Sequence, residues 1–169
     1  MQVIRMMPGK KLWQTLVTHL KDSGDARWVL DDHNLPKDEH LFFLAAVIDT
    51  LIVGNLTLKK QPVTSPPSEW AGERDRHLRD ASGSLIDEMF VYSFTVAPSH
   101  RRQGIGRALQ EAGLQLTRAE GCYQMRSWSS LDKKGNYLLK LGMGFGFHPE
   151  IQETASGLRV SGGYFVKVV

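Results

Sequence analysis

The chain has 169 residues, 41% of them hydrophobic and 23% charged, a composition typical of one globular domain and unlike a disordered or fibrous protein. A net charge of +3 suits an anionic ligand but falls short of the basic surface typical of nucleic-acid binding. The single cysteine, Cys122, excludes an internal disulfide and indicates a reducing compartment. The longest apolar run, 41–48, is too short to cross a bilayer, so we expect a cytoplasmic protein.

The first third of the chain predicts strands around one amphipathic helix. Residues 2–6 form a candidate strand, and leucines at helical spacing predict a helix over 11–20. The polar stretch 25–40 is irregular, with room for one short helix. Runs rich in strand-forming residues at 41–48 and 51–58 are separated by a two-residue turn, which predicts an antiparallel pair.

Residues 59–87 interrupt this pattern with three prolines, several serines and a charged run. A connection of this length inside a compact domain is usually either functional or disordered. We expect a long irregular insertion in an otherwise single domain spanning 1–169. A mobile surface loop and a flap that covers a substrate both stay open as interpretations.

The middle of the chain predicts a strand, a glycine-rich turn and a helix in direct succession. The strand spans 88–96, the turn spans 101–106, and the helix continues to Glu120 with Gly121 as its C-terminal cap. One apolar stripe is expected to face the core: Ile105, Ala108, Leu109, Ala112, Leu116 and Ala119.

The last third predicts three more strands around a short helix. We expect a strand at 123–128, a helix at 132–141, a strand near 146–149 and a closing strand at 164–169. Cys122 directly precedes the first of these strands, where a small buried residue is expected rather than a nucleophile.

The glycine-rich turn is the most informative feature of the chain. A turn that leads from a strand into a helix presents unpaired backbone N–H groups to one point, and the helix dipole adds positive charge there. Gly104 and Gly106 permit a close approach of the backbone to a ligand. Arg101, Arg102 and Arg107 add guanidinium groups, which suit phosphate oxygens. The pattern predicts a diphosphate site.

Two common nucleotide-binding motifs do not match this turn. A P-loop requires Lys and Ser or Thr after the last glycine, whereas Arg107 and Ala108 follow Gly106 here. A dinucleotide-binding fingerprint requires a third glycine at the position of Leu109, in a turn near the start of the fold.

The pattern Arg101-x-x-Gly104-x-Gly106, preceded by residues 94–98, resembles the acetyl-CoA pyrophosphate signature of the GNAT superfamily of N-acetyltransferases. The hairpin at 47–54 resembles the second and third strands of the same family. The resemblance implies an α/β (α+β) fold with a mixed, mostly antiparallel central sheet flanked by helices. It also implies that the fourth and fifth strands splay apart to admit acetyl-CoA, with no metal.

The resemblance further implies which residues contact the cofactor. The main chain of the fourth strand would bind the pantetheine amides, and serines after the fifth strand would replace a family asparagine, because Asn136 stands out of register. The expected cofactor-binding residues are Phe94, Thr95, Val96, Arg101, Arg102, Gln103, Gly104, Ile105, Gly106, Arg107, Ser129 and Asn136.

Acyl transfer from a thioester to an amine requires a base, a donor to the oxyanion and an acid for the leaving thiolate. Glu88 is the first candidate base and Asp87 the second, because both open the strand that leads to the cofactor. The alternative reading is two charged residues where a loop enters a strand. Tyr92 and Ser93 are further candidates by position.

The acid is a tyrosine on the last short helix in the family that the chain resembles. Depending on the alignment, that position is Leu138 or Lys140 here, and neither is a tyrosine. Tyr137 lies three residues from Lys140, on roughly the same helix face, and is our candidate acid. An aromatic side chain packed beneath the helix is the alternative.

The leading hypothesis is an N-acyltransferase that moves acetyl from acetyl-CoA to a primary amine on a small molecule or a protein. The alternative is a catalytically weak acyl-CoA-binding or sensor module. The acceptor pocket is expected from 20–40, 59–87 and 148–163. We expect no membrane or nucleic-acid partner, and a homodimer stays open. A weaker third reading is nucleic-acid contact through basic residues: Arg101, Arg102, Arg107, Lys133 and Lys134.

Overall fold

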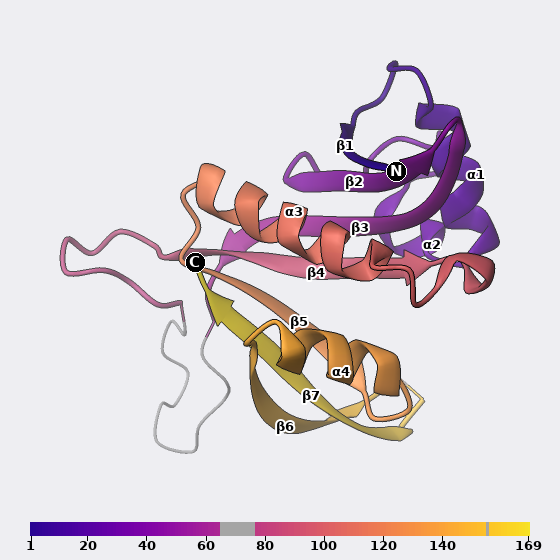
Figure 1. Cartoon of the computed structure of the whole chain (residues 1–169). Coiled ribbons are helices and arrows are strands. Elements are labelled where there is room, and N and C mark those ends of the chain that lie inside the picture. The colour runs from indigo at the N-terminus through magenta and orange to yellow at the C-terminus, as the bar shows by residue number, and fades with distance from the viewer. Residues whose placement is uncertain (65–76, 155) are drawn as a thin grey trace.

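The computed structural model describes residues 1–64, 77–154 and 156–169. Seven strands form one sheet in the order β1-β2-β3-β4-β5-β7-β6 (Figure 1). Every neighbouring pair is antiparallel except β4 and β5, which are parallel. The expected mixed, mostly antiparallel sheet is therefore confirmed. The strands are β1 (Gln2–Met6), β2 (Leu41–Ile48), β3 (Leu51–Pro62), β4 (Asp87–Val96), β5 (Gln124–Ser130), β6 (Gly146–Glu153) and β7 (Arg159–Val168).

Helices cover both faces of the sheet. The helices are α1 (Trp13–Asp22), α2 (Ala26–Val29), α3 (Ile105–Ala119) and α4 (Lys134–Gly142). On one face α3 packs on β2 and β3, and on the other α1 packs on β3 while α2 contacts β4. Two apolar cores result, because successive residues of β2 alternate between the faces: Leu44 and Ala46 belong to the α3 core, and Phe43 and Ala45 to the α1 core. No helix in the described ranges is long and apolar enough to span a membrane.

The sheet opens between β4 and β5. These strands pair only over Glu88–Phe90 and Gln124–Arg126, although both continue in the same direction. In Figure 1 they meet near the C-terminus and diverge toward the first turn of α3. The expected splay of the fourth and fifth strands is confirmed. A β-bulge lies on the diverging part of β4, because Thr57 pairs with Ser93 while Leu58 pairs with Val91, which leaves Tyr92 as the extra residue.

The predicted irregular segment 59–87 overestimates the irregular region at both ends. Residues 59–62 continue β3, and Asp87 already belongs to β4. The extension of β3 carries polar side chains, so a hydrophobicity pattern does not predict it. Two ion pairs stabilise this part of the strand: Lys59 binds Asp38 at 2.6 Å, and Lys60 lies 3.7 Å from Asp87. Residues 65–76 of the expected insertion lie outside the described residues.

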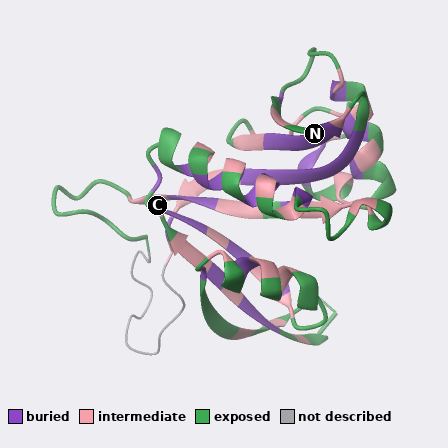
Figure 2. Ribbon diagram, viewed as in Figure 1, coloured by how far each residue is buried: buried purple, intermediate pink, exposed green. Residues whose placement is uncertain are grey.

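The strands predicted near 146–149 and at 164–169 are too short, because β6 and β7 form a longer hairpin across most of 148–163. Pairing extends from Gly146 with Val166 to Glu153 with Arg159. Strand β6 is the edge of the sheet, and most of its residues are exposed (Figure 2). An exposed edge strand carries little apolar alternation, which explains why the sequence underestimates it.

The buried face of α3 is rotated from the predicted apolar stripe. Ile105 and Leu109 are buried as expected, whereas Ala119 is exposed. The stripe also omitted polar and small residues that the structure buries. The omitted buried residues are Gln110, Gly113, Leu114 and Thr117. Gly121 ends the helix with a φ of 70°, which confirms the predicted cap.

Candidate functional site

The first turn of α3 is an open donor site. Gly104 occupies the position before the helix with a φ of 80°, in the left-handed region where glycine carries no steric penalty. No side chain among the described residues caps this helix, and the first N–H groups of an α-helix have no intrahelical acceptor. Arg102 also has a positive φ of 63°, which is uncommon for a residue with a Cβ. Backbone strain of this kind clusters at ligand-binding turns.

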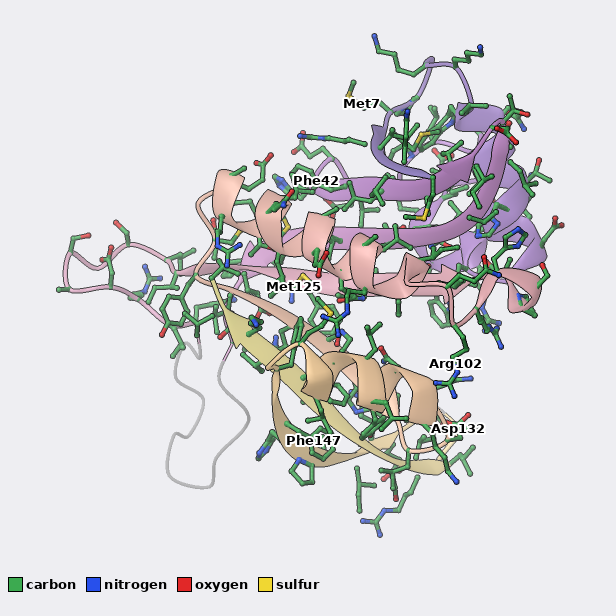
Figure 3. The ribbon with its side chains drawn as sticks, viewed as in Figure 1. Met7, Phe42, Arg102, Met125, Asp132 and Phe147 are labelled. Atoms are coloured by element: carbon green, nitrogen blue, oxygen red, sulfur yellow. The ribbon has the colours of Figure 1, made fainter. Side chains whose placement is uncertain are left out.

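The arginine-rich turn is ordered by its own polar contacts. Arg101 donates from Nε to the Val96 carbonyl at 3.0 Å, and Gln103 donates from Nε2 to the Ser99 carbonyl at 3.2 Å. Arg107 lies 3.9 Å from Glu111, an exposed pair one helical turn apart. In Figure 3 the Arg102 side chain points from this turn toward Asp132, which lies just before α4. Positive charge therefore gathers where β4 and β5 are furthest apart.

Gly106 allows three elements to meet behind the turn. A Cβ at this position would lie 3.2 Å from Cδ2 of Leu139 on α4 and 3.3 Å from Cζ of Phe94 on β4. Such contacts are shorter than ordinary van der Waals packing. The glycine thus lets α3 pack closely against the opening strand and against α4 across the gap.

The α4 side of the gap brings three predicted residues together. Asn136 donates from Nδ2 to Ser129 Oγ at 3.1 Å, and the Tyr137 hydroxyl donates to the Ser129 carbonyl at 3.0 Å. The Tyr137 ring packs on Phe147 and Phe165, with centroids 5.2 and 4.8 Å away. Burial, with a smaller contribution from the Asp132 charge, raises the pKa of Tyr137, so its hydroxyl stays protonated at neutral pH.

Glu88, the first candidate base, lies in a buried ion pair. Its side chain is fully buried, and it accepts hydrogen bonds from Arg126 Nε at 2.9 Å, Gln124 Nε2 at 2.8 Å and Gln61 Nε2 at 3.1 Å. Both carboxylate oxygens are used by these donors. Such contacts favour a structural role for Glu88, the alternative that the sequence left open.

The other face of β4 carries a polar network that the sequence did not reveal. Asp25 Oδ2 accepts hydrogen bonds from Ser93 Oγ at 2.7 Å and Thr95 Oγ1 at 2.8 Å. Asn55 donates to Ser93 Oγ at 2.7 Å, and His19 lies 3.2 Å from Asn55 Oδ1. Asp25 directly precedes α2, where an acidic residue reads as an ordinary helix cap. Only the packing of α2 on β4 brings this carboxylate to the opening strand.

A buried lysine lies at the closed end of the gap. Lys140 of α4 is 1% exposed, and its Nζ donates to Ser127 Oγ, directly after the last β5 residue that pairs with β4. The rings of Phe145 and Phe165 lie within 6 Å of the same amine. Burial lowers the pKa of Lys140 to about 7. In contrast, burial raises the pKa of Cys122 to about 11, consistent with a packed thiol rather than a nucleophile.

The described residues contain no group of three or more His, Cys, Asp or Glu side chains able to hold a metal ion. The uncapped turn at Gly104, the diverging parallel strands β4 and β5 and the crossover helix α3 lie together at one end of the sheet.

The family comparison agrees with this geometry. The family model described as the acetyltransferase (GNAT) family matches residues 28–143, more than half of the chain. The protein therefore belongs to the GNAT acetyltransferase family. No curated protein sequence matches the chain significantly.

Solved structures share the fold across nearly the whole chain. Arabidopsis thaliana NAA60 in complex with acetyl-CoA is similar with a TM-score of 0.70 and 15% identity, covering 99% of each chain. The ribosomal-protein-S18-alanine N-acetyltransferase of Escherichia coli has a TM-score of 0.60 and 13% identity, covering 99% of this chain and 94% of that one. An aminoglycoside 6′-N-acetyltransferase complexed with coenzyme A has a TM-score of 0.64 and 12% identity, covering 99% and 97%.

Lys140→Met should make stability less dependent on pH. Between about pH 7 and 10.5 the unfolded chain binds a proton at Lys140 that the folded protein does not, so the free energy of unfolding of the wild type rises with pH. The advantage of Lys140→Met over the wild type should be largest at or below pH 7 and shrink toward pH 10. Urea denaturation across this range measures it. The exposed Lys134→Met is the control, and a constant difference between Lys140→Met and the wild type would contradict the burial argument.

Proposed function

We propose that this protein transfers an acetyl group from acetyl-CoA to a primary amine on a small molecule or a protein. The observation that carries the proposal is the uncapped first turn of α3 next to the gap between β4 and β5. A diphosphate fits this turn because its N–H groups and the dipole of a 15-residue helix converge there with three arginines. Solved structures of the same fold contain acetyl-CoA or CoA. We also propose that the protein acts in the cytoplasm.

The proposed cofactor contacts follow the chain from the turn into the gap. Residues 101–107 would bind the diphosphate, and the main chain of 94–96 would bind the pantetheine amides. The Val96 carbonyl already accepts a hydrogen bond from Arg101, which ties the arginine turn to this edge of β4. On the opposite wall, Ser129 and Asn136 form one hydrogen-bonded pair on the α4 side.

The proposed chemistry places a base and an acid on opposite faces of the sheet. Asp25, instead of Glu88, would attract the acceptor ammonium and take its proton, because its carboxylate lies on the α2 face of the diverging β4. Tyr137 would protonate the leaving thiolate from the α4 face. The bulge leaves Tyr92 outside the pairing with β3, and its N–H is our candidate donor to the thioester oxygen.

A CoA-binding or sensor module is the second candidate function. It is favoured by the full hydrogen bonding of Glu88 and by the lack of a tyrosine at the position that the resemblance predicts. Thiol release from acetyl-CoA with a panel of amines separates the two functions. Release that depends on an amine supports the transferase, and CoA binding without turnover supports the sensor.

Gly104→Ala should weaken CoA binding by about tenfold or more. A Cβ in the left-handed region costs roughly 1–2 kcal/mol, and relief of this strain moves the N–H groups away from the diphosphate. Isothermal titration calorimetry measures the dissociation constant. Gly83→Ala is a matched control, since Gly83 has a similar φ of 85° in a turn between Arg79 and Leu85. Equal affinities of Gly104→Ala and the wild type would contradict the proposed diphosphate site.

Asp25→Asn should lower kcat/KM for the amine by about 100-fold without changing the dissociation constant of CoA. The amide oxygen still accepts the hydrogen bonds of Ser93 and Thr95, so the substitution removes charge and basicity with little loss of structure. Steady-state kinetics and calorimetry measure the two quantities. Asp32→Asn, at an exposed position before β2, is the control. Unchanged kinetics of Asp25→Asn would exclude this carboxylate as the base.

Tyr137→Phe should lower kcat by at least about tenfold while the KM for acetyl-CoA stays close to the wild-type value. The ring retains its packing on Phe147 and Phe165, so the loss isolates the hydroxyl proton. Thiol-release kinetics at saturating substrates provide the measurement, with the exposed Tyr123→Phe as a control. If turnover is unchanged, Tyr137 is not the acid.

A further inference from the structure

Gln110 is a fully buried amide without a hydrogen-bond partner. Its side chain in α3 is 0% exposed, and neither Nε2 nor Oε1 has a partner among the described residues. An unpaired buried donor or acceptor is unfavourable, and nearly all such groups in folded proteins are satisfied. Two other buried polar side chains follow the rule: Thr117 donates to the Gly113 carbonyl at 2.7 Å, and Lys140 donates to Ser127. Thr57 Oγ1, Trp128 Nε1 and Asn136 Oδ1 also lack a partner, but among the described residues only Gln110 leaves both a donor and an acceptor of one side chain unpaired.

The position of Gln110 is defined by the two glycines that flank it on the same face of α3. Gly106 lies four residues before it, and a Cβ there would meet Phe94 of β4 at 3.3 Å. Gly113 lies three residues after it, and a Cβ there would lie 2.7 Å from Cδ2 of Leu56 on β3 and 3.3 Å from Sδ of Met125 on β5. Residues three and four apart are neighbours on one helix face. Gln110 therefore lies over the region where β4 and β5 separate.

The strands beneath Gln110 leave main-chain groups without a sheet partner. β4 and β5 pair only as far as Phe90 and Arg126, so Phe94 lies on the unpaired part of β4 and Met125 on the last paired part of β5. Figure 3 shows Met125 between α3 and the layer that carries α4. The amide of Gln110 is thus placed above the closed end of the gap, about one and a half helical turns from the diphosphate turn.

We infer that Gln110 binds an amide group of the pantetheine arm, with Nε2 donating to its carbonyl and Oε1 accepting from its N–H. This inference rests on the proposed function. A primary carboxamide carries the two complementary groups that a secondary amide requires. In the unliganded protein the amide of Gln110 has no partner, which is unfavourable. Binding of the pantetheine arm would pair both groups and so add to the free energy of binding.

The test compares Gln110→Leu with the wild type in two binding measurements. Calorimetry with CoA should give a dissociation constant about tenfold higher for the variant, the size expected for one lost buried hydrogen bond. Adenosine 3′,5′-diphosphate, which lacks the pantetheine arm, should bind both proteins equally. In the absence of ligand the melting temperature of the variant should rise by about 2–4 °C, since an unpaired buried amide is replaced by an apolar group.

Two further variants keep the test decisive. Gln110→Met retains the length of the side chain and should reproduce the loss of CoA affinity if Gln110→Leu folds poorly. Gln115→Leu makes the same chemical change on the exposed face of α3 and should bind CoA like the wild type. Wild-type affinity for CoA in folded Gln110→Leu or Gln110→Met would overturn this inference alone. Failure of the wild type itself to bind CoA would overturn the proposed function as well.

Discussion

The closed end of the gap between β4 and β5 depends on one buried ion pair. Glu88 and Arg126 lie at opposite ends of the short parallel pairing of β4 with β5, two residues apart in register, and Gln124 and Gln61 complete the carboxylate's hydrogen bonds. A buried carboxylate without these donors would be strongly destabilising. Arg126 also lies about 5 Å from the ring centroids of Phe90 and Tyr164. These contacts join the two halves of the sheet at one end and leave the other end free to separate.

Where β4 and β5 stop pairing, polar side chains lie on both faces of the sheet. The α3 and α4 face carries the arginine-rich turn before α3, Tyr137 and the Ser129–Asn136 pair, whereas the α1 and α2 face carries Asp25 with Ser93 and Thr95. β4 contributes to both faces, because its side chains alternate and the bulge at Tyr92 shifts that alternation midway. A carrier on one face and an acceptor on the other would meet only within the gap. In the proposed reaction, this arrangement would keep the two substrates apart until their reactive groups are aligned.

Local patterns predicted the elements but misjudged several of their boundaries and several side chains. The hairpin of β2 and β3, the turn before α3 and the splay were all expected, since each depends on short-range glycine, proline or strand-former signals or on the family resemblance. The length of β6 and the end of β3 were missed, because edge residues and ion-paired lysines carry no apolar alternation. Gln110 was overlooked because an amide on an amphipathic helix reads as a surface residue. It lies between two glycines, Gly106 and Gly113, that let α3 pack closely on the sheet.

The sequence by itself determined the local conformations: a left-handed glycine before α3, a helix with its first N–H groups free, and arginines on both sides. These properties depend on neighbouring residues along the chain, so they can be read without a fold. Only the tertiary structure decided which polar side chains become hydrogen-bond partners. Asp25 reaches Ser93 across 68 positions and Glu88 reaches Arg126 across 38, and such partnerships arise only when strands pair and helices pack. For the same reason the sequence cannot show that Glu88 is buried against Arg126 while Asp25 lies beside Ser93 and Thr95.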